Sequence, residues 1–433
     1  MLKSIFTDKK HFHSSYPDFI SRRHTCGVSC GFFASPNYYL SGDIQGNIVA
    51  WDIIDRDIVL QIKNQNQLLK GSKNSVVSVC STHAYKPQCL EEIIVCVFLN
   101  VSYVCSTSIL KKIPMSCFRQ RFHGQIELWN LTKSIKSSCI HLNTSHFTRF
   151  CYLEHDLHGS ATETSCLYLT TSATHDSAYL YDLKRTRSCH PLIKLPALVP
   201  EKIPGFTQTS SVKSSGWVAG IHCVSMLGPS YVLLVYEGFA LQALFDLRQP
   251  KGPVTSPVCF PQDVQTTISS SVTRNQCWIG TAEGNIITTE IESTGQLCAK
   301  EKINVYEPVS SLINDHLEYK KELKESMQSQ CKFGISDIVF TPDTTIGLAG
   351  GWDGQWRCFD VATRDILSTT PYHSQPISCI NLEKENGVLA IASHVRSICG
   401  LVHFEIICDL YKFCQDSRIS FWKTAWRAIA VEQ

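Results

Sequence analysis

Short apolar runs and tight-turn residues alternate most clearly between Ile346 and Asp360, where the sequence reads IGLAGGWDGQWRCFD. An apolar run from Ile346 ends in two glycines, and Asp353-Gly354 then provides a two-residue turn, because Asp and Gly tolerate positive φ angles. From Gln355 to Asp360, apolar and polar residues alternate as they do in a strand with one buried face. The pattern predicts a β-hairpin.

The flanking residues add one strand on each side of this hairpin. Gly334 to Phe340 (GISDIVF) is a short apolar segment that runs into Thr-Pro-Asp, and Asp365 to Ser368 is a candidate fourth strand. Four short antiparallel strands within about 40 to 45 residues form the repeat unit, or blade, of a WD40 β-propeller. A blade cannot bury both of its faces alone, so we expect it to recur along the chain.

The hairpin pattern does recur, in whole or in part, as a strand of small and apolar residues, a turn and a second strand. It is found at Tyr39 to Asp52, His123 to Asn130, Leu169 to Asp182, Val232 to Asp246, Cys277 to Glu290 and Ser417 to Lys423. With the first example these segments predict about seven blades, within the usual range of about four to eight. We therefore expect an all-β protein, with a single seven-bladed WD40 β-propeller over residues 19–426.

Two sets of residues mark the repeats. The second strand of the hairpin ends in an aromatic residue, in most cases followed by Asp or Asn: Trp51-Asp52, Trp129-Asn130, Tyr181-Asp182, Phe245-Asp246, Phe359-Asp360 and Trp422. The turns carry Gln45-Gly46, Glu283-Gly284, Asp353-Gly354 and Asp416. Turn carboxylates brace hairpins through local hydrogen bonds, so we expect these turn residues to be structural. We expect Trp51, Trp129, Trp356 and Trp422 to point into the core.

The chain before the first hairpin offers a closing strand. Phe19 to His24 has the pattern of a short strand. In ring-shaped propellers an N-terminal strand commonly completes the last blade and removes an open sheet edge. We expect this strand to pair with the segment Ser417 to Lys423.

Two segments depart from the repeat. Residues 84–121 lie within the second blade and include Ile93 to Leu110, an uncharged run of about the minimum length for a membrane span. A span there would put two parts of one ring on opposite sides of a bilayer, and the run is rich in Ser, Thr and Asn, so we expect an insertion instead. Residues 394–413 form a second expected insertion, within the last blade between VLAIAS and QDSRISFW.

Composition narrows the possible partners. The 433 residues include 40 Lys and Arg and 38 Asp and Glu, and the net charge of +2 creates no strong field for nucleic acid or anionic membranes. The 21 cysteines contain no C-x-x-C pair and lie mostly in apolar runs, which does not fit a metal site. The N-terminus lacks the apolar run of a signal peptide, so we expect a reducing, intracellular compartment. We also expect no cofactor.

One segment matches a hydrolase motif. Gly27 to Gly31 (GVSCG) fits the G-x-S-x-G nucleophile elbow, which needs a strand before the serine and a helix after it. Phe32 to Pro36 cannot begin a helix of any length, so we expect the first strand of a blade here. The sequence has no P-loop, metal constellation or coherent catalytic set, which favours a protein that is not an enzyme. A catalytic site assembled from distant blades is the alternative that stays open.

Binding residues of a propeller are expected on the loops of a rigid disk. Trp352 and Arg357 lie at and just after the turn of the clearest hairpin. Trp and Arg dominate the hot spots of protein interfaces, so these two residues are the expected partner contacts.

The chain resembles WD40-repeat proteins, and among them it is similar to the family of guanine nucleotide-binding protein β-subunit-like protein 1 and the fungal ASTRA-associated protein 1. The similarity is densest from Gly334 to Trp422, in the order GISDIVFTPD, LAGGWDGQWRCFD, ISCINL, VLAIAS and DSRISFW. The opening FISRRHTCGVSCGFF and LSGDIQGNIVAWDI are similar to the family's first repeat. A G-protein β subunit fits less well, because residues 1–20 contain Pro17 and no heptad pattern for a coiled coil.

This resemblance implies a non-enzymatic scaffold that works with the TTT co-chaperone machinery in the maturation and stability of phosphatidylinositol 3-kinase-related kinases. It implies protein partners, a monomer within a larger complex, and a location in nucleus and cytoplasm. The alternative is a substrate-receptor subunit of a ubiquitin ligase, a role that many WD40 proteins have and that the fold alone does not reject.

Overall fold

The computed structural model describes residues 17–21, 24, 27–63, 72–81, 92–101, 123–130, 135–142, 151–153, 167–171, 176–182, 190–198, 203, 216–260, 266–306, 333–383, 387–393 and 419–423. Every element of regular secondary structure in this part of the chain is a β-strand, as the sequence predicts. They form seven antiparallel sheets, which we call the first to seventh blades in chain order.

Each blade is built from strands that follow one another in the sequence, except that the last blade also takes the first strand of the chain. The first blade contains β2 (Val28–Phe33), β3 (Tyr38–Asp43), β4 (Ile48–Asp52) and β5 (Asp57–Ile62). The second contains β6 (Ser72–Ser81), β7 (Glu92–Val101), β8 (His123–Asn130) and β9 (Ile135–Leu142). The third contains β10 (Cys151–Leu153), β11 (Leu167–Thr171), β12 (Ala178–Asp182) and β13 (Ile193–Lys194).

The remaining four blades follow the same order. The fourth contains β14 (Val218–Cys223), β15 (Tyr231–Tyr236) and β16 (Gln242–Asp246). The fifth contains β17 (Thr267–Val272), β18 (Gln276–Thr281), β19 (Asn285–Ile291) and β20 (Leu297–Asn304). The sixth contains β21 (Ile335–Phe340), β22 (Ile346–Gly351), β23 (Gln355–Asp360) and β24 (Ile366–Pro371). The seventh contains β25 (Ile377–Leu382), β26 (Val388–Ser393), β27 (Ile419–Lys423) and β1 (Phe19–Ser21).

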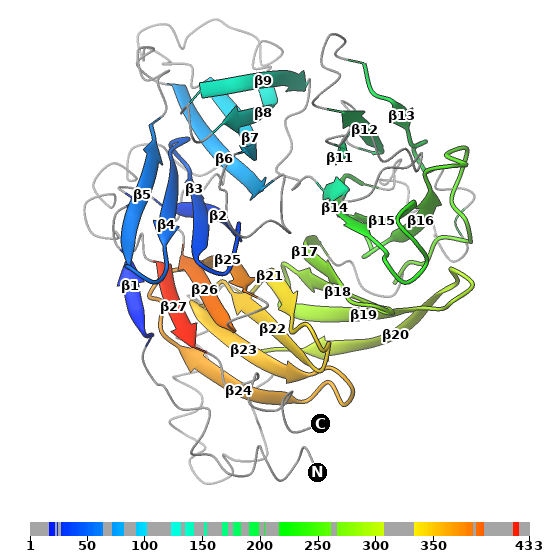
Figure 1. Ribbon diagram of the computed structural model, residues 1–433. Coiled ribbons are helices and arrows are strands. Elements are labelled where there is room, and N and C mark those ends of the chain that lie inside the picture. The colour runs from blue at the N-terminus through cyan, green and yellow to red at the C-terminus, as the bar shows by residue number, and fades with distance from the viewer. Residues whose placement is uncertain are drawn as a thin grey trace, which may run out of the picture.

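The blades lie around a common centre, with the first strand of each blade innermost (Figure 1). Inner strands of neighbouring blades contact one another, for example β14 with β17, β17 with β21, β21 with β25 and β25 with β2. Blades bury their faces against each other: Trp278 of the fifth blade is fully buried and meets Phe340 and Phe359 of the sixth edge-on, with ring centroids 5.2 and 5.9 Å apart. In this way each sheet buries faces that it could not bury alone.

The N-terminal strand closes the ring as predicted. Strand β1 pairs antiparallel with β27, and Phe19 and Ser21 lie opposite Phe421 and Ile419. The strand ends at Ser21, earlier than expected, and His24 lies outside it with a different role. The pairing covers the edge that β27 would otherwise expose.

The inner strands share an irregularity that the sequence pattern did not predict. In six blades the pairing between the first and second strands shifts, which marks a β-bulge, and in five of them the shift falls at the second residue of the inner strand. In three of these blades the bulged residue is a serine that donates a hydrogen bond to the second strand: Ser29 to Gly42 at 3.1 Å, Ser336 to Gly350 at 3.1 Å and Ser378 to Ala392 at 3.2 Å. Ser29 therefore belongs to a strand, as expected, and does not form a nucleophile elbow.

The expected insertion at residues 84–121 of the second blade is wrong for one part of this range. Glu92–Val101 forms strand β7, which pairs with both β6 and β8, so these residues belong to the blade. The apolar character of Ile93 onward is that of a strand inside a sheet. Residues 84–91 and 102–121 lie outside the described part, as do 394–413, although β26 and β27 on either side of the latter pair directly. Among the described residues, no helix has the length and apolar character needed to cross a bilayer.

Candidate functional site

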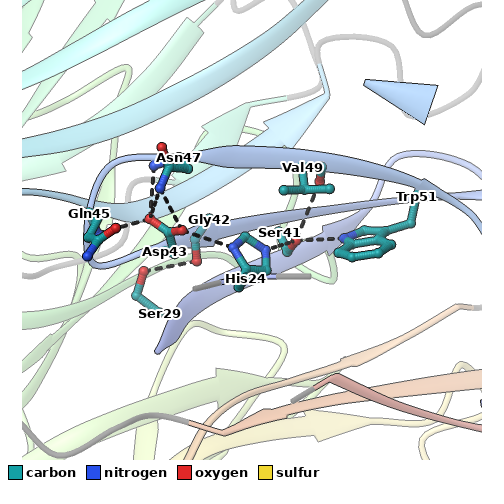
Figure 2. Close-up of polar contacts among 9 residues, drawn as sticks. All are labelled: His24, Ser29, Ser41, Gly42, Asp43, Gln45, Asn47, Val49 and Trp51. Carbon is teal, nitrogen blue, oxygen red and sulfur yellow. Dashed lines mark hydrogen bonds and ion pairs between the residues drawn. The ribbon is translucent and has the colours of Figure 1, made fainter. Parts of the chain in front are cut away.

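A buried polar network ties the chain that enters the first blade to the hairpin of that blade (Figure 2). Nδ1 of His24 lies 3.0 Å from Oδ2 of Asp43, and Nε2 of His24 lies 2.7 Å from Oγ of Ser41. The indole nitrogen of Trp51 donates to the same Oγ at 2.7 Å. Four side chains from the entering segment, β3 and β4 thus form one continuous network.

Asp43 also holds the turn that follows it. Its Oδ1 accepts the backbone amides of Gln45 and Asn47, each at 2.9 Å, and the side-chain amide of Asn47 donates to Oδ2 at 2.9 Å. Burial by itself raises the pKa of Asp43, but the hydrogen bonds from His24 and Asn47 outweigh it and hold that pKa below its ordinary value. Asp43 is therefore held as a carboxylate.

The set Asp43, His24 and Ser41 has the residue types of a catalytic triad, but its geometry is closed. Ser41 is fully buried, and its Oγ contacts His24, Trp51 and the carbonyl of Val49. A nucleophile must reach a substrate carbonyl, and this hydroxyl faces the protein interior. The network is structural. The roles of His24, Ser41 and Asp43 were not predicted from the sequence. The available signal was their order along the chain: a His before the first blade, then Ser-Gly-Asp at the end of a strand, then a Trp at the end of the next strand.

The predicted turn residues lie in turns where the structure describes them. Gly46, Gly284 and Gly354 have φ angles of 85°, 83° and 78°, which favour glycine. Both carboxylate oxygens of Glu283 accept the amide of Thr266 at 3.1 Å. One detail was wrong: at Asp353-Gly354 only the glycine has a positive φ, and its amide donates to the Gly351 carbonyl at 3.2 Å.

The residues at the ends of the third strands share one arrangement. The aromatic side chains of Trp51, Tyr181, Phe245 and Phe359 are buried, and Trp356 is buried as well. The carboxylates of Asp52, Asp246 and Asp360 accept backbone amides two residues further on, at 2.8, 3.0 and 2.8 Å, and so cap the next turn. Asp182 is buried. Asp416 and the side chains of Trp129, Asn130 and Trp422 lie outside the described part of the structure.

The turn of the sixth blade is held by a different cluster, which we call the Trp352 cluster: Tyr306, Phe333, Trp352, Asp353 and Arg357. Nη2 of Arg357 lies 2.6 Å from Oδ2 of Asp353, and the guanidinium lies 4.7 Å from the centroid of the Tyr306 ring. The Tyr306 hydroxyl donates to the Gly334 carbonyl at 3.1 Å. Burial first, and the Asp353 charge second, raise the pKa of Tyr306, so the hydroxyl keeps its proton.

This cluster takes the place of the histidine network. Gly351 in β22 has the same pairing position as Asp43 in β3, since each lies opposite the first residue of its inner strand. A Cβ at Gly351 would collide with the carboxylate of Asp353 and the hydroxyl of Tyr306. In the sixth blade, the space that the Asp43 side chain occupies in the first blade is therefore filled by the ion pair of Asp353 and Arg357 and by the Tyr306 ring.

The Trp352 cluster lies on one face of the ring. In an antiparallel blade the start of the first strand and the turn between the second and third strands lie at the same edge. We call the face formed by these segments the loop face. Segments of the loop face also link neighbouring blades. For example, the amide of His373, which precedes β25 of the seventh blade, donates to the Gly354 carbonyl in the turn of the sixth blade at 3.2 Å.

Large aromatic side chains are exposed on the loop face. Trp217 directly precedes β14 and is 48% exposed, Phe333 precedes β21 and is 39% exposed, and Trp352 is partly exposed in its turn. Trp352 thus lies where a partner could contact it. The Arg357 side chain is only 7% exposed and engages Asp353 and Tyr306, so its role is to hold the turn.

Comparison with known proteins assigns the fold. No family model matches the chain, and no curated protein matches it. Among solved structures it is similar to the β-propeller domain of Cps50 (Swd1) from Myceliophteria thermophila, with a TM-score of 0.58 over 94% of this chain and 99% of that one. The chain has the β-propeller fold. At 11% sequence identity the likeness concerns the fold and not the partner.

Proposed function

We propose that this propeller is a non-enzymatic scaffold that binds proteins through the loop face around Trp352. The observation that carries this proposal is the exposure of Trp217, Phe333 and Trp352 on a rigid ring. Exposed aromatic residues on a preformed surface are the usual anchors of protein interfaces, because they bury much apolar area with little loss of side-chain entropy.

The arrangement of the polar residues is compatible with this role. The described residues contain no group of three or more His, Cys, Asp or Glu side chains placed to hold a metal ion. The combination of Asp43, His24 and Ser41 is enclosed and occupied by structural hydrogen bonds. The loop face instead offers aromatic surface backed by the ion pair of Asp353 and Arg357.

The narrower proposal names the partner. The sequence resemblance from Gly334 to Trp422 supports a scaffold that works with the TTT co-chaperone machinery and its client phosphatidylinositol 3-kinase-related kinases. This role would place the protein in nucleus and cytoplasm, as a single copy within a larger complex. The part of the chain that carries the resemblance includes Trp352, Asp353 and Arg357 of the Trp352 cluster, so the proposed partner and the proposed surface are linked.

Affinity purification of the tagged full chain from its own cells, followed by mass spectrometry, tests both levels. We expect TTT components and their kinases to be recovered with the wild type and to be lost with Trp352→Ala. Ile54→Ala is the matched control, because Ile54 is 68% exposed in the turn between the third and fourth strands of the first blade, on the opposite face. Recovery of ubiquitin-ligase adaptors would replace the partner and keep the scaffold. Equal recovery with both variants would overturn the loop face as the binding surface.

A further inference from the structure

Contacts of the inner strands with the neighbouring blade follow a common scheme, in which a polar group of one blade meets a polar group of the next. Four examples among the described residues are His222 with Ser270, Ser269 with the Ile335 carbonyl, the Ile380 amide with Asp337, and Asn381 with Tyr39, at distances of 2.7, 2.6, 2.8 and 3.2 Å. These contacts tie the fourth blade to the fifth and continue through the sixth and seventh to the first. They hold the inner wall of the ring together.

At the boundary between the third and fourth blades the corresponding contact is made by two cysteines. Sγ of Cys151 in β10 lies 3.3 Å from Sγ of Cys223 in β14, although the two residues are 72 positions apart in the sequence. The separation is longer than a disulfide bond of about 2.05 Å and short enough to be closed by small side-chain rotations. Both residues are partly exposed, so a small oxidant can reach them.

The boundary lies beside the third blade, which has short strands in the part of the chain that the structure describes. Strand β10 has 3 residues and β13 has 2, whereas the strands of the sixth blade have 6 each. Short strands provide few ladder hydrogen bonds, so contacts with a neighbouring blade help to hold the third blade in place. A covalent link from β10 to β14 would add to these contacts.

We propose that Cys151 and Cys223 form a reversible disulfide that fastens the third blade to the fourth under oxidising conditions. The oxidant is a low-molecular-weight disulfide such as oxidised glutathione. The thiolate of one cysteine attacks the glutathione disulfide, which forms a mixed disulfide and releases one reduced glutathione. The thiolate of the other cysteine attacks the protein sulfur of the mixed disulfide and releases the second. In total, the two cysteine thiols lose two electrons, one glutathione disulfide gains them, and both thiol protons end on the two molecules of reduced glutathione.

Other described cysteines are less suited to this reaction. Cys30, Cys277, Cys358 and Cys379 are buried in blade interiors, where an oxidant cannot approach them. Cys298 donates a hydrogen bond to Glu292 at 3.3 Å, and this contact raises the pKa of its thiol. Burial raises the pKa of Cys259. A raised pKa lowers the thiolate fraction, so these two thiols react more slowly than an unperturbed cysteine.

The test uses the full chain, fully reduced and then incubated with oxidised glutathione, alkylated and digested with trypsin without reduction. We expect one crosslinked pair of peptides, residues 150–184 joined to 214–248. Because the first of these also contains Cys166, fragment ions must place the link on Cys151. We expect the oxidised protein to melt a few degrees higher than the reduced protein, since the link closes a long loop, and dithiothreitol to reverse this shift.

Variants separate the proposed link from other thiol chemistry. Cys151→Ser and Cys223→Ser should each abolish both the crosslinked peptide and the shift in melting temperature, whereas Cys259→Ser and Cys166→Ser should keep both. If a serine variant fails to fold, the corresponding alanine variant replaces it. A stable mixed disulfide with glutathione at either cysteine, a link through Cys166, or a crosslink without any change in melting temperature would overturn the proposal.

Discussion

Arg357 and Asp353 form an ion pair of 2.6 Å inside the turn of the sixth blade, and the Arg357 guanidinium lies over the Tyr306 ring. Arg248 and Asp246 repeat this chemistry in the fourth blade, with a 2.8 Å ion pair and the guanidinium over the Tyr231 ring. The two pairs differ in burial, because the Arg357 side chain is 7% exposed and that of Arg248 is 60% exposed. The same contact is therefore dry in one blade and solvated in the other.

This difference predicts unequal effects of removing the two arginines. Arg357→Ala removes a buried guanidinium that pairs with Asp353 and packs over the Tyr306 ring, and should destabilise the protein by about 2 kcal/mol. Arg248→Ala should have little effect, since a solvated ion pair adds little to stability. Urea unfolding of both variants, followed by tryptophan fluorescence, measures the difference. Equal losses would show that burial of the Arg357 pair does not matter.

The histidine network of the first blade makes a second prediction. His24→Ala removes a partner from both Asp43 and Ser41 in a dry environment, so we expect a loss of about 3 kcal/mol and a lower melting temperature. His190 is exposed, and His190→Ala is the matched control that should melt like the wild type. A His24→Ala protein with an unchanged melting curve would show that the network adds no net stability.

The lowered pKa of Asp43 predicts a pH dependence. A carboxylate whose pKa is lower in the folded state adds stability above its unfolded pKa, near the ordinary value of 3.8, and that stability is lost as the pH falls through the folded pKa. The difference in melting temperature between wild type and Asp43→Asn should therefore be largest near neutral pH and shrink below pH 3.8. Melting curves from neutral pH to strongly acidic pH measure it, and a difference that stays constant would contradict the assignment.

Ring closure predicts a sharp boundary for N-terminal deletions. A chain that starts at residue 17 keeps both β1 and His24 and should fold like the full chain. A chain that starts at residue 22 loses β1, exposes the edge of β27, and should lose its cooperative melt and much of its solubility. Solubility and calorimetry of the two chains provide the comparison. A cooperative melt without β1 would show that the ring does not need this strand.

Several residues of the candidate site could be identified from the sequence, but their separate roles could not be predicted. Trp352 and Arg357 are close in sequence and were both expected to contact a partner. The structure buries Arg357, because Tyr306 from the end of the fifth blade lies against its guanidinium and Gly351 leaves room for its ion pair. Residues so far apart in the chain leave no local pattern. For the same reason the role of His24 could not be inferred, since its partners lie 17 and 19 residues further on.

The hairpins, the positions of their turns and the closing strand could be predicted from the sequence. These features depend on alternation along one strand, on glycines at positive φ, and on carboxylates that bond to amides two residues away, and all of these are read within a few residues. Tertiary structure alone decided the bulges of the inner strands, the assignment of Glu92–Val101 to a blade, and the approach of Cys151 to Cys223. These depend on how sheets pack around a ring, where the contacting atoms come from blades that are distant in sequence but adjacent in space.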